Sequence, residues 1–576
     1  MSEKMTGYPS IDKPWLKWYK KENLNKKIPE YNLLADLYLN NKDNMDGFAI
    51  RYMGKRITYR ELFRGIACAE EVLEELILSE TKSVTFISLF NPDMVYIFYA
   101  LNHMGIICNM IDPQLPIDEI CRKINKMESH YVVIQDVFAK SIPRILEQVE
   151  LEKIILISTN FGDSTTGVMI DKMPNKINDD ISLSNKVICW NLESKERCSL
   201  SCLEKNLEVS RDKIAAVFYT GGTTGESKGV ELTNYNIVSV GVQFGNLTNR
   251  FSRGQTWLTT SVPFVAYVFV IAFHMPLTFG IECCIEMFDP KQLVNNVIAN
   301  EYNHISASPA FYEELLKYEK DDIDLSFIEM PITGADKLSE KLYRDINSFL
   351  KEHNCEWNLC NGYGMTEVAS GVCVSYLGAS NKAGSVGIPF SDTIISAFDV
   401  LTGKECVIGE SGEICISGPS VMAGYYKEKE ATENVLKQHD GRLWMHTGDI
   451  GHIDEDGCVF IEGRIKRMIM TYKAFKIFPS AVEEVILSHP DVDNCSCVSI
   501  PDKTHNAGCL PAVVIVLKDN NQDEECIIDE LIELCKAHLP EYSIPYDYYF
   551  KKELPLTHAG KIDYRKLEDE INTGNV

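Results

Sequence analysis

The run YTGGTTGESKGV, from Tyr219 to Val230, constrains this chain most, because it is rich in Gly and Thr and directly follows the apolar segment Ile214 to Phe218. Glycines let backbone N–H groups approach phosphate oxygens closely, threonines add hydroxyl donors, and a lysine adds a cation. The residues concerned are Thr220, Gly221, Gly222, Thr223, Thr224, Gly225 and Lys228. The run predicts a strand that ends in a loop for a nucleotide triphosphate.

This loop differs from a Walker A loop, which ends in Gly-Lys-Ser/Thr so that a hydroxyl reaches magnesium. Here Ser227 precedes Lys228 and Gly229 follows it. The alternative interpretation is a Gly-rich turn with a solvated lysine. The rest of the chain favours the phosphate loop.

Three further segments follow the loop in order. They are NGYGMTE (Asn361 to Glu367), HTGDIG (His446 to Gly451) with EGRIKR (Glu462 to Arg467), and LPLTHAGK (Leu554 to Lys561). Together with the loop they resemble the motifs of the adenylate-forming superfamily, which includes acyl-CoA synthetases, peptide-synthetase adenylation domains and beetle luciferases. One such motif is a weak signal, whereas four in the family's order make the resemblance specific.

The resemblance implies two domains. A large N-terminal adenylate-forming domain, residues 1–465, binds ATP and the acyl substrate, and a small mobile C-terminal domain, residues 466–576, carries the catalytic lysine. The residue pattern agrees, because short apolar runs alternate with amphipathic stretches as layered α/β subdomains require. The run from Ser380 to Tyr425 predicts a small β-rich subdomain, and the stretch beyond Lys466 predicts a compact α+β unit.

Several local elements are also expected. Ser83 to Phe90 is predicted to be a strand, and Met94 to Gly105 a helix that glycine ends. Thr233 is predicted to cap the helix that follows the phosphate loop. The apolar run from Val262 to Ile281 is long enough to cross a membrane but contains Pro263, Pro276 and His274, so a buried strand and helix are expected there instead.

The resemblance assigns the chemistry to particular residues. Joining a carboxylate to ATP is opposed by charge repulsion, so the site needs cations and hydrogen-bond donors more than a general base. Lys561 matches the lysine that bridges the carboxylate and the α-phosphate. Thr366 matches the hydroxyl that contacts the α-phosphate, and Glu367 matches the carboxylate that binds magnesium.

A second set of residues matches the family's nucleotide-binding positions. Asp449 matches the carboxylate that takes both ribose hydroxyls, a geometry that two oxygens satisfy at once. Arg464 matches the arginine that reaches ribose and phosphate, and Tyr363 matches the ring that stacks on adenine. The other expected nucleotide contacts are Gly334, Ala335, Asn361, Gly362 and Gly364.

Lys466 matches the hinge about which the small domain turns between adenylation and transfer to a thiol. The loop from Thr471 to Pro479 would then face the active site. This chain departs from the family there, because it has Lys473 and Ala474 with an apparent one-residue insertion, and Arg467 where an acidic residue is common. These departures concern the thioester-forming arrangement and leave adenylation untouched.

The expected acyl pocket is formed by Phe264, Val265, Ala266 and Tyr267. Many acyl-activating relatives carry a gating histidine after the proline and aromatic residue, whereas this chain has Val265 and Ala266. Amino-acid-activating relatives place an Asp in this stretch, and none occurs from Val262 to Met275. A buried ammonium without a partner costs several kcal/mol, so an apolar acid fits better than an amino acid.

Composition narrows the partners and the compartment. The formal charge of −26, from 57 basic and 83 acidic residues, argues against nucleic acid as a partner and requires that ATP be met by a local basic site. The N-terminus has no apolar signal segment, and no transmembrane segment is expected. The nineteen cysteines, among them Cys198 and Cys202, show no paired zinc spacing, so free thiols in a reducing cytoplasm are expected.

The sequence therefore predicts an AMP-forming acid–thiol ligase, most like a fatty-acid-type acyl-CoA synthetase, that uses ATP, magnesium and coenzyme A. One alternative is a stand-alone ligase that loads the acyl adenylate onto the phosphopantetheine of a separate carrier protein. Another is a non-catalytic nucleotide- or acyl-binding protein on the same fold. The presence of Lys561, Glu367 and Asp449 argues against the non-catalytic alternative.

Overall fold

The structure is a computed structural model that describes residues 5–573 with gaps. The gaps are residues 25, 79, 161–184, 191, 193–197, 221–226, 249, 288, 319–322, 337, 377–380, 474, 506–507, 519–523 and 557–561. The predicted phosphate-loop residues Gly221, Gly222, Thr223, Thr224 and Gly225 and the predicted catalytic Lys561 therefore lie outside the described residues.

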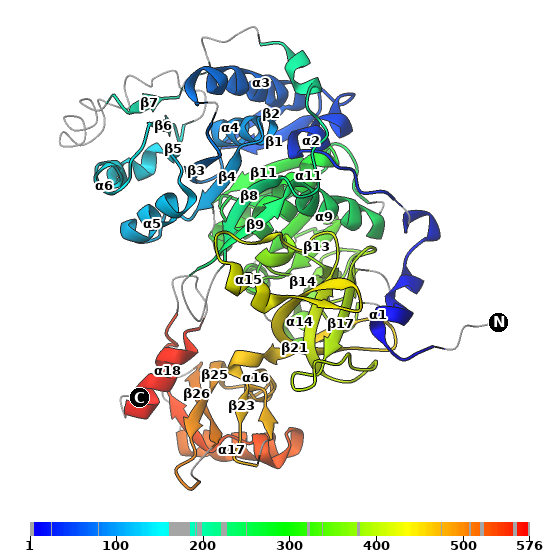
Figure 1. The fold of residues 1–576 in the computed structure, drawn as a ribbon. Coiled ribbons are helices and arrows are strands. Elements are labelled where there is room, and N and C mark those ends of the chain that lie inside the picture. Colours follow the sequence, from blue (N-terminus) through cyan, green and yellow to red (C-terminus); the bar gives the residue numbers. More distant parts are fainter. Residues whose placement is uncertain are drawn as a thin grey trace.

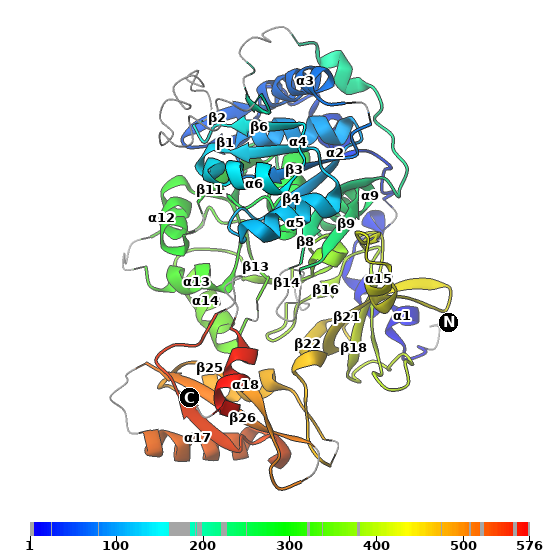
Figure 2. The same cartoon turned by 60° about the vertical axis from the view of Figure 1, so that its left-hand side comes forward.

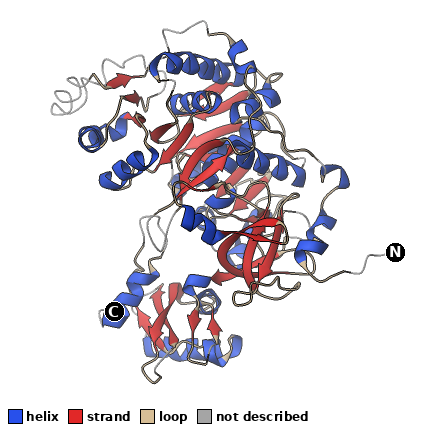
Figure 3. Ribbon diagram, viewed as in Figure 1, coloured by secondary structure: helices blue, strands red, loops and turns tan. Residues whose placement is uncertain are grey.

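One sheet dominates the N-terminal part of the chain, with the strand order β19-β9-β8-β4-β3-β5-β6-β7 (Figure 1). Its strands are β3 (Ser83–Ile87), β4 (Ile107–Ile111), β5 (Tyr131–Gln135), β6 (Lys153–Ile157), β7 (Val187–Cys189), β8 (Ile214–Tyr219), β9 (Gly229–Thr233) and β19 (Gly424–Tyr425). The strands β3 to β6 pair in parallel. Helices cover this sheet, so its central strands β3 and β5 are buried throughout (Figure 3).

A second sheet has the order β16-β15-β14-β13-β12-β10-β11-β1-β2. Its strands are β1 (Phe48–Tyr52), β2 (Lys55–Thr58), β10 (Thr256–Thr260), β11 (Glu282–Glu286), β12 (His304–Ala307), β13 (Met330–Thr333), β14 (Cys360–Tyr363), β15 (Cys373–Val374) and β16 (Ile388–Pro389). The strands from β10 to β14 run parallel, so their carboxyl ends share one edge. In open α/β sheets this edge is where ligands bind.

The two sheets meet near the ends of β3 and β10. The Phe90 N–H, just after β3, donates to the Ser261 carbonyl, just after β10, at 3.0 Å. The Phe90 ring also packs against Phe273, with ring centroids 4.4 Å apart. Segments far apart in the sequence are therefore joined where the carboxyl ends of both sheets converge.

Side-chain caps begin several helices of the large domain. Thr58 and Glu61 form a capping box at the start of α3, and Thr233 forms one with Asn236 at the start of α9, as predicted for Thr233. Asn91 caps α4, which ends at His103 near Gly105. Helix bounds are α1 (Pro9–Asp12), α2 (Leu33–Asn41), α3 (Tyr59–Leu76), α4 (Pro92–His103), α5 (Ile117–Met127), α6 (Ile142–Gln148), α9 (Asn234–Leu247), α12 (Pro290–Asn300), α13 (Pro309–Leu316) and α14 (Glu340–Glu352).

The prediction of a strand within Val262 to Ile281 was wrong. This segment is helical, through α10 (Ala266–Phe269), a π-helical turn (Val270–His274) and α11 (Met275–Thr278), and the strands lie on either side of it. Pro276 has no N–H for the Ala272 carbonyl, and the Thr259 hydroxyl donates to that carbonyl at 2.5 Å instead. Along the described chain, no helix combines the length and the apolarity that a membrane crossing needs.

A β-rich subdomain follows, as predicted, but it extends further along the chain than Tyr425. Its strands are β17 (Ile394–Phe398), β18 (Gly412–Ser417), β20 (Leu436–His439), β21 (Arg442–Ile453) and β22 (Val459–Arg464), with α15 (Lys429–Val435) beside them. The strand β21 pairs with β18, β20 and β22. It is the central strand of the subdomain and carries the HTGDIG motif.

The C-terminal elements form a separate α+β body at one end of the molecule (Figures 1 and 2). They are β23 (Ile469–Met470), β24 (Lys476–Ile477), α16 (Pro479–Leu487), β25 (Val492–Pro501), β26 (Cys509–Leu517), α17 (Glu524–His538), β27 (Asp547–Phe550) and α18 (Tyr564–Thr573). The strands β25, β26 and β27 form one sheet, and apolar residues of α16, α17 and this sheet form a core of their own. The large N-terminal part and the smaller C-terminal part agree with the predicted fold class.

A buried carboxylate ties the edge hairpin of the second sheet to its neighbour. Glu282, at the start of β11, is fully buried, and its two carboxylate oxygens accept from the guanidinium groups of Arg51 and Arg56. Arg51 and Arg56 come from β1 and β2, respectively. Because both guanidinium groups bind in a bidentate manner, the geometry fixes β1 and β2 against β11.

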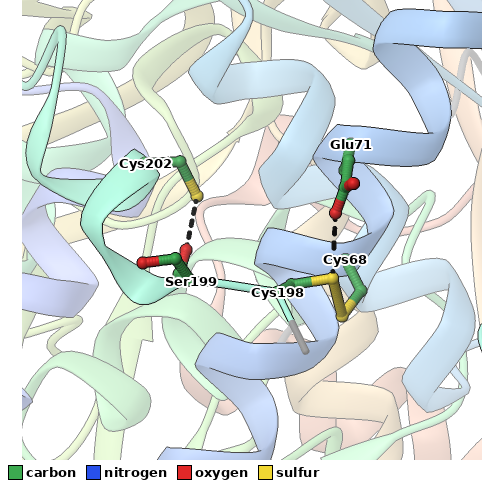
Figure 4. The surroundings of a disulfide bond; sticks show 5 residues. All are labelled: Cys68, Glu71, Cys198, Ser199 and Cys202. Carbon is green, nitrogen blue, oxygen red and sulfur yellow. Dashed lines mark hydrogen bonds between the residues drawn. A yellow bond between two sulfur atoms is a disulfide. The ribbon is translucent and has the colours of Figure 1, made fainter. Parts of the chain in front are cut away.

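A disulfide joins Cys68 in α3 to Cys198, just before the 3₁₀ turn Leu200–Glu204 (Figure 4). The prediction that all cysteines are free thiols was therefore wrong for this pair, and the other cysteines are free. The two residues are 130 positions apart, so no local spacing could reveal the pairing. Cys202, weighed with Cys198 as a metal ligand, instead donates its thiol to the Ser199 carbonyl at 3.1 Å.

Candidate active site

Predicted nucleotide-binding residues meet at the carboxyl ends of β13 and β14. Gly334 follows β13, and a side chain there would come within 3.3 Å of the Gly362 carbonyl on β14. A side chain at Gly364 would overlap the Ser370 carbonyl at 1.6 Å, so only glycine fits. Ala335 adopts the left-handed backbone conformation with φ 69°. The close approach of these backbones leaves a surface without side chains beside Tyr363.

Asp449, on β21, joins two other predicted nucleotide residues. The Tyr363 hydroxyl donates to its Oδ2 at 2.6 Å, and Arg464 Nε lies 2.6 Å from its Oδ1. Asp449 and Arg464 face each other in the register of β21 and β22. Burial, with the nearby Asp449 carboxylate, raises the pKa of Tyr363 well above its usual value. Both oxygens expected to take the ribose hydroxyls thus hold protein donors in this structure.

The predicted magnesium ligand Glu367 lies in the turn after β14 and is buried. The Tyr425 hydroxyl donates to its Oε1 at 2.8 Å, and Lys228 Nζ lies 4.7 Å from the centre of the Tyr425 ring. Thr220 and Lys228 are hydrogen bonded through backbone and hydroxyl groups, which brings the two ends of the phosphate loop together. Tyr425 therefore links the expected magnesium and phosphate sites.

Lys228, which was predicted to contact the phosphates of ATP, lies at the edge of a cavity. The cavity has a volume of about 430 Å³, and α15 with the residues just before it forms the other wall. The lining residues are Lys228, Lys427, Glu428, Lys429, Glu430, Ala431 and Asn434. Three lysines and two glutamates line this cavity, so its lining is weakly basic in a chain that is strongly acidic as a whole.

Two other predicted site residues, Asn361 and Thr366, lie on β14 and in the turn that follows it. The Asn361 amide group donates to the Ser385 carbonyl at 3.1 Å, so its side chain braces the end of β14. Thr366 begins the short turn Thr366–Val368 that carries Glu367. The neighbouring residues Ala369 and Ser370 have φ values of 52° and 97°, so the backbone here is held in an unusual conformation.

The predicted acyl-pocket residues lie at the same sheet edge. Phe264 and Val265 precede α10, and Ala266 and Tyr267 are its first residues. The Tyr267 hydroxyl is hydrogen bonded to the Ser306 hydroxyl, which lies on β12 next to β13. Burial raises the pKa of Tyr267 to about 12, so this hydroxyl stays protonated. Apart from the Tyr267 hydroxyl, the side chains of these four residues are apolar.

The predicted hinge residue Lys466 lies in the 3₁₀ turn Ile465–Arg467 between β22 and β23. The next residue, Arg467, differs from the family pattern, and the structure supplies a reason. Its guanidinium lies 2.5 Å from the Glu483 carboxylate of α16, and it also donates to the Cys497 carbonyl at 3.1 Å. The basic residue is therefore matched by an acidic partner within the C-terminal body.

Sequence reasoning missed two residues of this region. Tyr425 holds Glu367, and Glu413 contacts the loop that carries Asp449. Both come from segments with weak local signals, and their partners lie far away in the sequence. Glu413 lies in the run from Ser380 to Tyr425, which predicted only a β-rich subdomain.

The sequence profile of AMP-binding enzymes matches residues 39–426, and that of the AMP-binding enzyme C-terminal domain matches residues 481–561. The chain belongs to the AMP-binding enzyme family. It therefore belongs to an ATP-binding family of adenylate-forming enzymes. This identification confirms the adenylate-forming resemblance that the four motifs predicted.

Relatives within the AMP-binding enzyme family match nearly the whole chain. A long-chain-fatty-acid–CoA ligase of Salmonella typhimurium is 26% identical over 538 residues, covering 90% of this chain and 91% of the relative. One of Bacillus subtilis is 26% identical over 568 residues, covering 97% and 98%. ATP-bound MatB from Rhodopseudomonas palustris has a TM-score of 0.77 at 22% identity, covering 95% and 99%. The amide bond synthetase McbA from Marinactinospora thermotolerans has a TM-score of 0.76 at 19% identity, covering 93% and 99%.

The buried position of Glu367 predicts a pH-dependent activity. Burial raises its pKa, and the hydrogen bond from Tyr425 with the charges of Arg464 and Lys228 offsets this only in part. Below the raised pKa the ionised fraction falls about tenfold per pH unit. We therefore expect kcat/KM for magnesium–ATP to fall at acidic pH, starting at a higher pH than an ordinary glutamate would give, and Glu367→Gln to lack this limb.

The raised pKa of Glu367 changes stability with pH in the opposite direction to activity. A loss of activity at acidic pH caused by Glu367 can therefore be distinguished from unfolding. Because its pKa is higher in the folded state, the native protein holds this proton more tightly than the unfolded chain. Its contribution to stability is therefore lost as the pH rises, not as it falls. Melting temperatures measured beside the rate profile check this, and an acid loss of activity that follows an acid loss of folding would contradict the assignment to Glu367.

Proposed function

We propose that this chain activates a fatty acid with ATP and transfers the acyl group to coenzyme A. In the first step a carboxylate oxygen attacks the α-phosphorus of ATP, the bond from that phosphorus to the bridging oxygen breaks, and pyrophosphate leaves. In the second step the thiol sulfur of coenzyme A attacks the acyl carbonyl, its proton is lost, and AMP leaves. The AMP-forming family supports the first step, and the names of the fatty-acid ligases support the acid and the acceptor.

The observation that carries this proposal is the contact of Tyr363, Asp449 and Arg464. Three residues predicted separately to bind adenine, ribose and phosphate come from β14, β21 and β22 and meet through one carboxylate. Glu367 would bind magnesium, which would neutralise charge on the phosphates. Lys228 and the lysines of the adjoining cavity would hold the pyrophosphate end. Lys561 would bring its cation to the carboxylate and the α-phosphate.

A panel of acids tests the substrate assignment. Because the stretch from Phe264 to Tyr267 lacks a carboxylate, each buried methylene should contribute about 0.8 kcal/mol, or roughly fourfold in adenylation efficiency. Pyrophosphate release should therefore rise along a series of straight-chain acids and fall beyond one length. Each α-amino acid should stay near background beside its deaminated analogue.

Adding coenzyme A or a phosphopantetheinyl carrier protein to the same assay identifies the acceptor. We expect a thioester with coenzyme A, detected by mass spectrometry. If a thioester forms only with the carrier protein, the carrier protein and not coenzyme A is the acceptor. A preference for an amino acid over its deaminated analogue would contradict the fatty-acid proposal.

A further inference from the structure

The loop that presents Asp449 is a bulge in β21. On β18, Glu413 pairs with Ile450 and Cys415 pairs with His446, so β21 carries extra residues between these two partners. The extra residues include Thr447 and Asp449, and Gly448 between them has a φ of 73°. A bulge bends a strand and re-aims a side chain, here that of Asp449. Its position must be fixed by contacts outside the regular ladder.

Glu413 supplies these contacts with both carboxylate oxygens. Its Oε1 accepts from the Gly448 N–H at 3.0 Å, and its Oε2 lies 2.7 Å from His446 Nδ1. The two bonds lie at the centre and at the start of the bulge. Two further bonds shape its interior, because the Thr447 hydroxyl donates to the Ile414 carbonyl at 2.6 Å and accepts from the Asp449 N–H at 3.0 Å.

His446 is itself held in place. Its Nε2 lies 3.2 Å from His439 Nε2, and the Cys415 thiol lies 3.4 Å from its Nδ1. Burial raises the pKa of Glu413, but the hydrogen bonds from His446 and Gly448 with the attraction of the imidazole outweigh it, so this pKa lies below its usual value. The carboxylate therefore stays ionised and keeps both acceptors at neutral pH.

We propose that Glu413, oriented by His446, is a positioning residue for Asp449 and sets the affinity of the site for the ribose of the nucleotide. The inference rests on the nucleotide-binding part of the proposed function. It concerns only the ribose, because Asp449 is the group that Glu413 positions through Gly448. Tyr363 and Arg464 also contact Asp449, but β14 and β22 hold them, so the adenine and phosphate contacts should not respond.

Nucleotides with and without ribose hydroxyls separate this role from a general effect on folding. Calorimetry should show AMP binding to Glu413→Ala roughly tenfold weaker than to the wild type, the worth of one hydrogen bond to a charged group. Binding of 2′,3′-dideoxy-AMP should be the same for both proteins, because this ligand offers Asp449 no hydroxyl. Glu413→Gln keeps a carbonyl acceptor for Gly448 and should recover most of the difference.

The pair His452 and Glu462 provides the matched control. His452 Nδ1 lies 2.7 Å from Glu462 Oε1 on the same two strands that carry Asp449 and Arg464, but away from the bulge. His446→Gln should weaken AMP binding and raise the KM for ATP with little change in kcat, whereas His452→Gln should do neither.

Several outcomes would overturn the inference. They are unchanged AMP affinity in Glu413→Ala, an equal loss for AMP and dideoxy-AMP, or an equal effect of His452→Gln. If Glu413→Ala does not fold, Glu413→Gln and His446→Gln still test the inference. The AMP affinity of each of these two variants must then lie between that of the wild type and that of Asp449→Ala. A wild type that distinguishes AMP from dideoxy-AMP but activates no acid would remove the proposed function and leave this inference standing.

Discussion

Replacing Lys561 by alanine should slow acyl-adenylate formation by about a hundredfold or more, the usual cost of removing one charge-stabilising donor from a transition state. The reason is that the attacking carboxylate and the α-phosphate are both anionic, and Lys561 would bridge them. Thioester formation from a preformed acyl adenylate should be spared, because that step needs no such bridge. The two half-reactions are measured separately, as pyrophosphate exchange and as release of AMP from the synthetic adenylate.

Lys552 provides a control in the same domain. It is an exposed lysine on the segment before the LPLTHAGK motif, and Lys552→Ala should leave both half-reactions within twofold of wild type. Equal damage to both half-reactions in Lys561→Ala would contradict the role assigned to it. It would point instead to a general effect on the C-terminal body.

The second large effect concerns stability. In the double variant Arg51→Met, Arg56→Met the fully buried Glu282 would lose both partners, and the free energy of unfolding should fall by about 3–5 kcal/mol. Glu282→Gln should cost less, because the side chains of Arg51 and Arg56 are 22% and 41% exposed and can turn to water. This asymmetry is characteristic of a buried charge held by partly exposed partners.

Urea unfolding followed by tryptophan fluorescence measures this effect, since all six tryptophans precede residue 465 and report on the large domain. The control is Arg144→Met, which breaks an exposed pair with Asp118 and should cost no more than about 1 kcal/mol. A double arginine variant no less stable than Arg144→Met would show that the pairing is dispensable. If Glu282→Gln lowers the free energy of unfolding more than the double variant does, the two arginines and not the buried carboxylate carry the larger cost of losing a partner.

Local signals predicted the parts of the fold that depend on neighbours in the sequence. Thr233 caps α9 because its hydroxyl and the Asn236 side chain lie within one turn of each other. The segment Val262 to Ile281 was misassigned because a continuous apolar run fits a strand and a buried helix equally well. In its π-helical turn the Ala272 carbonyl accepts from the Thr259 hydroxyl, a contact that a pattern of apolar residues does not reveal.

In the candidate site, too, the sequence predicted some residues and not others. Motif residues such as Asp449 and Tyr363 could be named from the sequence, because the family motifs mark them. Glu413 and Tyr425 could not, because each acts through contacts with residues from another strand or turn that lie far away in the sequence. The disulfide between Cys68 and Cys198 is another long-range contact of this kind.

The register of β21 and β22 has a consequence for the order of events in catalysis. Asp449 and Arg464 form the last pair of that ladder, and the proposed hinge Lys466 follows two residues later. Lys466 lies in a 3₁₀ turn beyond the end of this ladder, so a rotation there would twist that turn and not the strands that hold Asp449. In the proposed reaction the acyl adenylate would then stay bound through its ribose to Asp449 while the small domain rotates, so a single bound intermediate would serve both half-reactions.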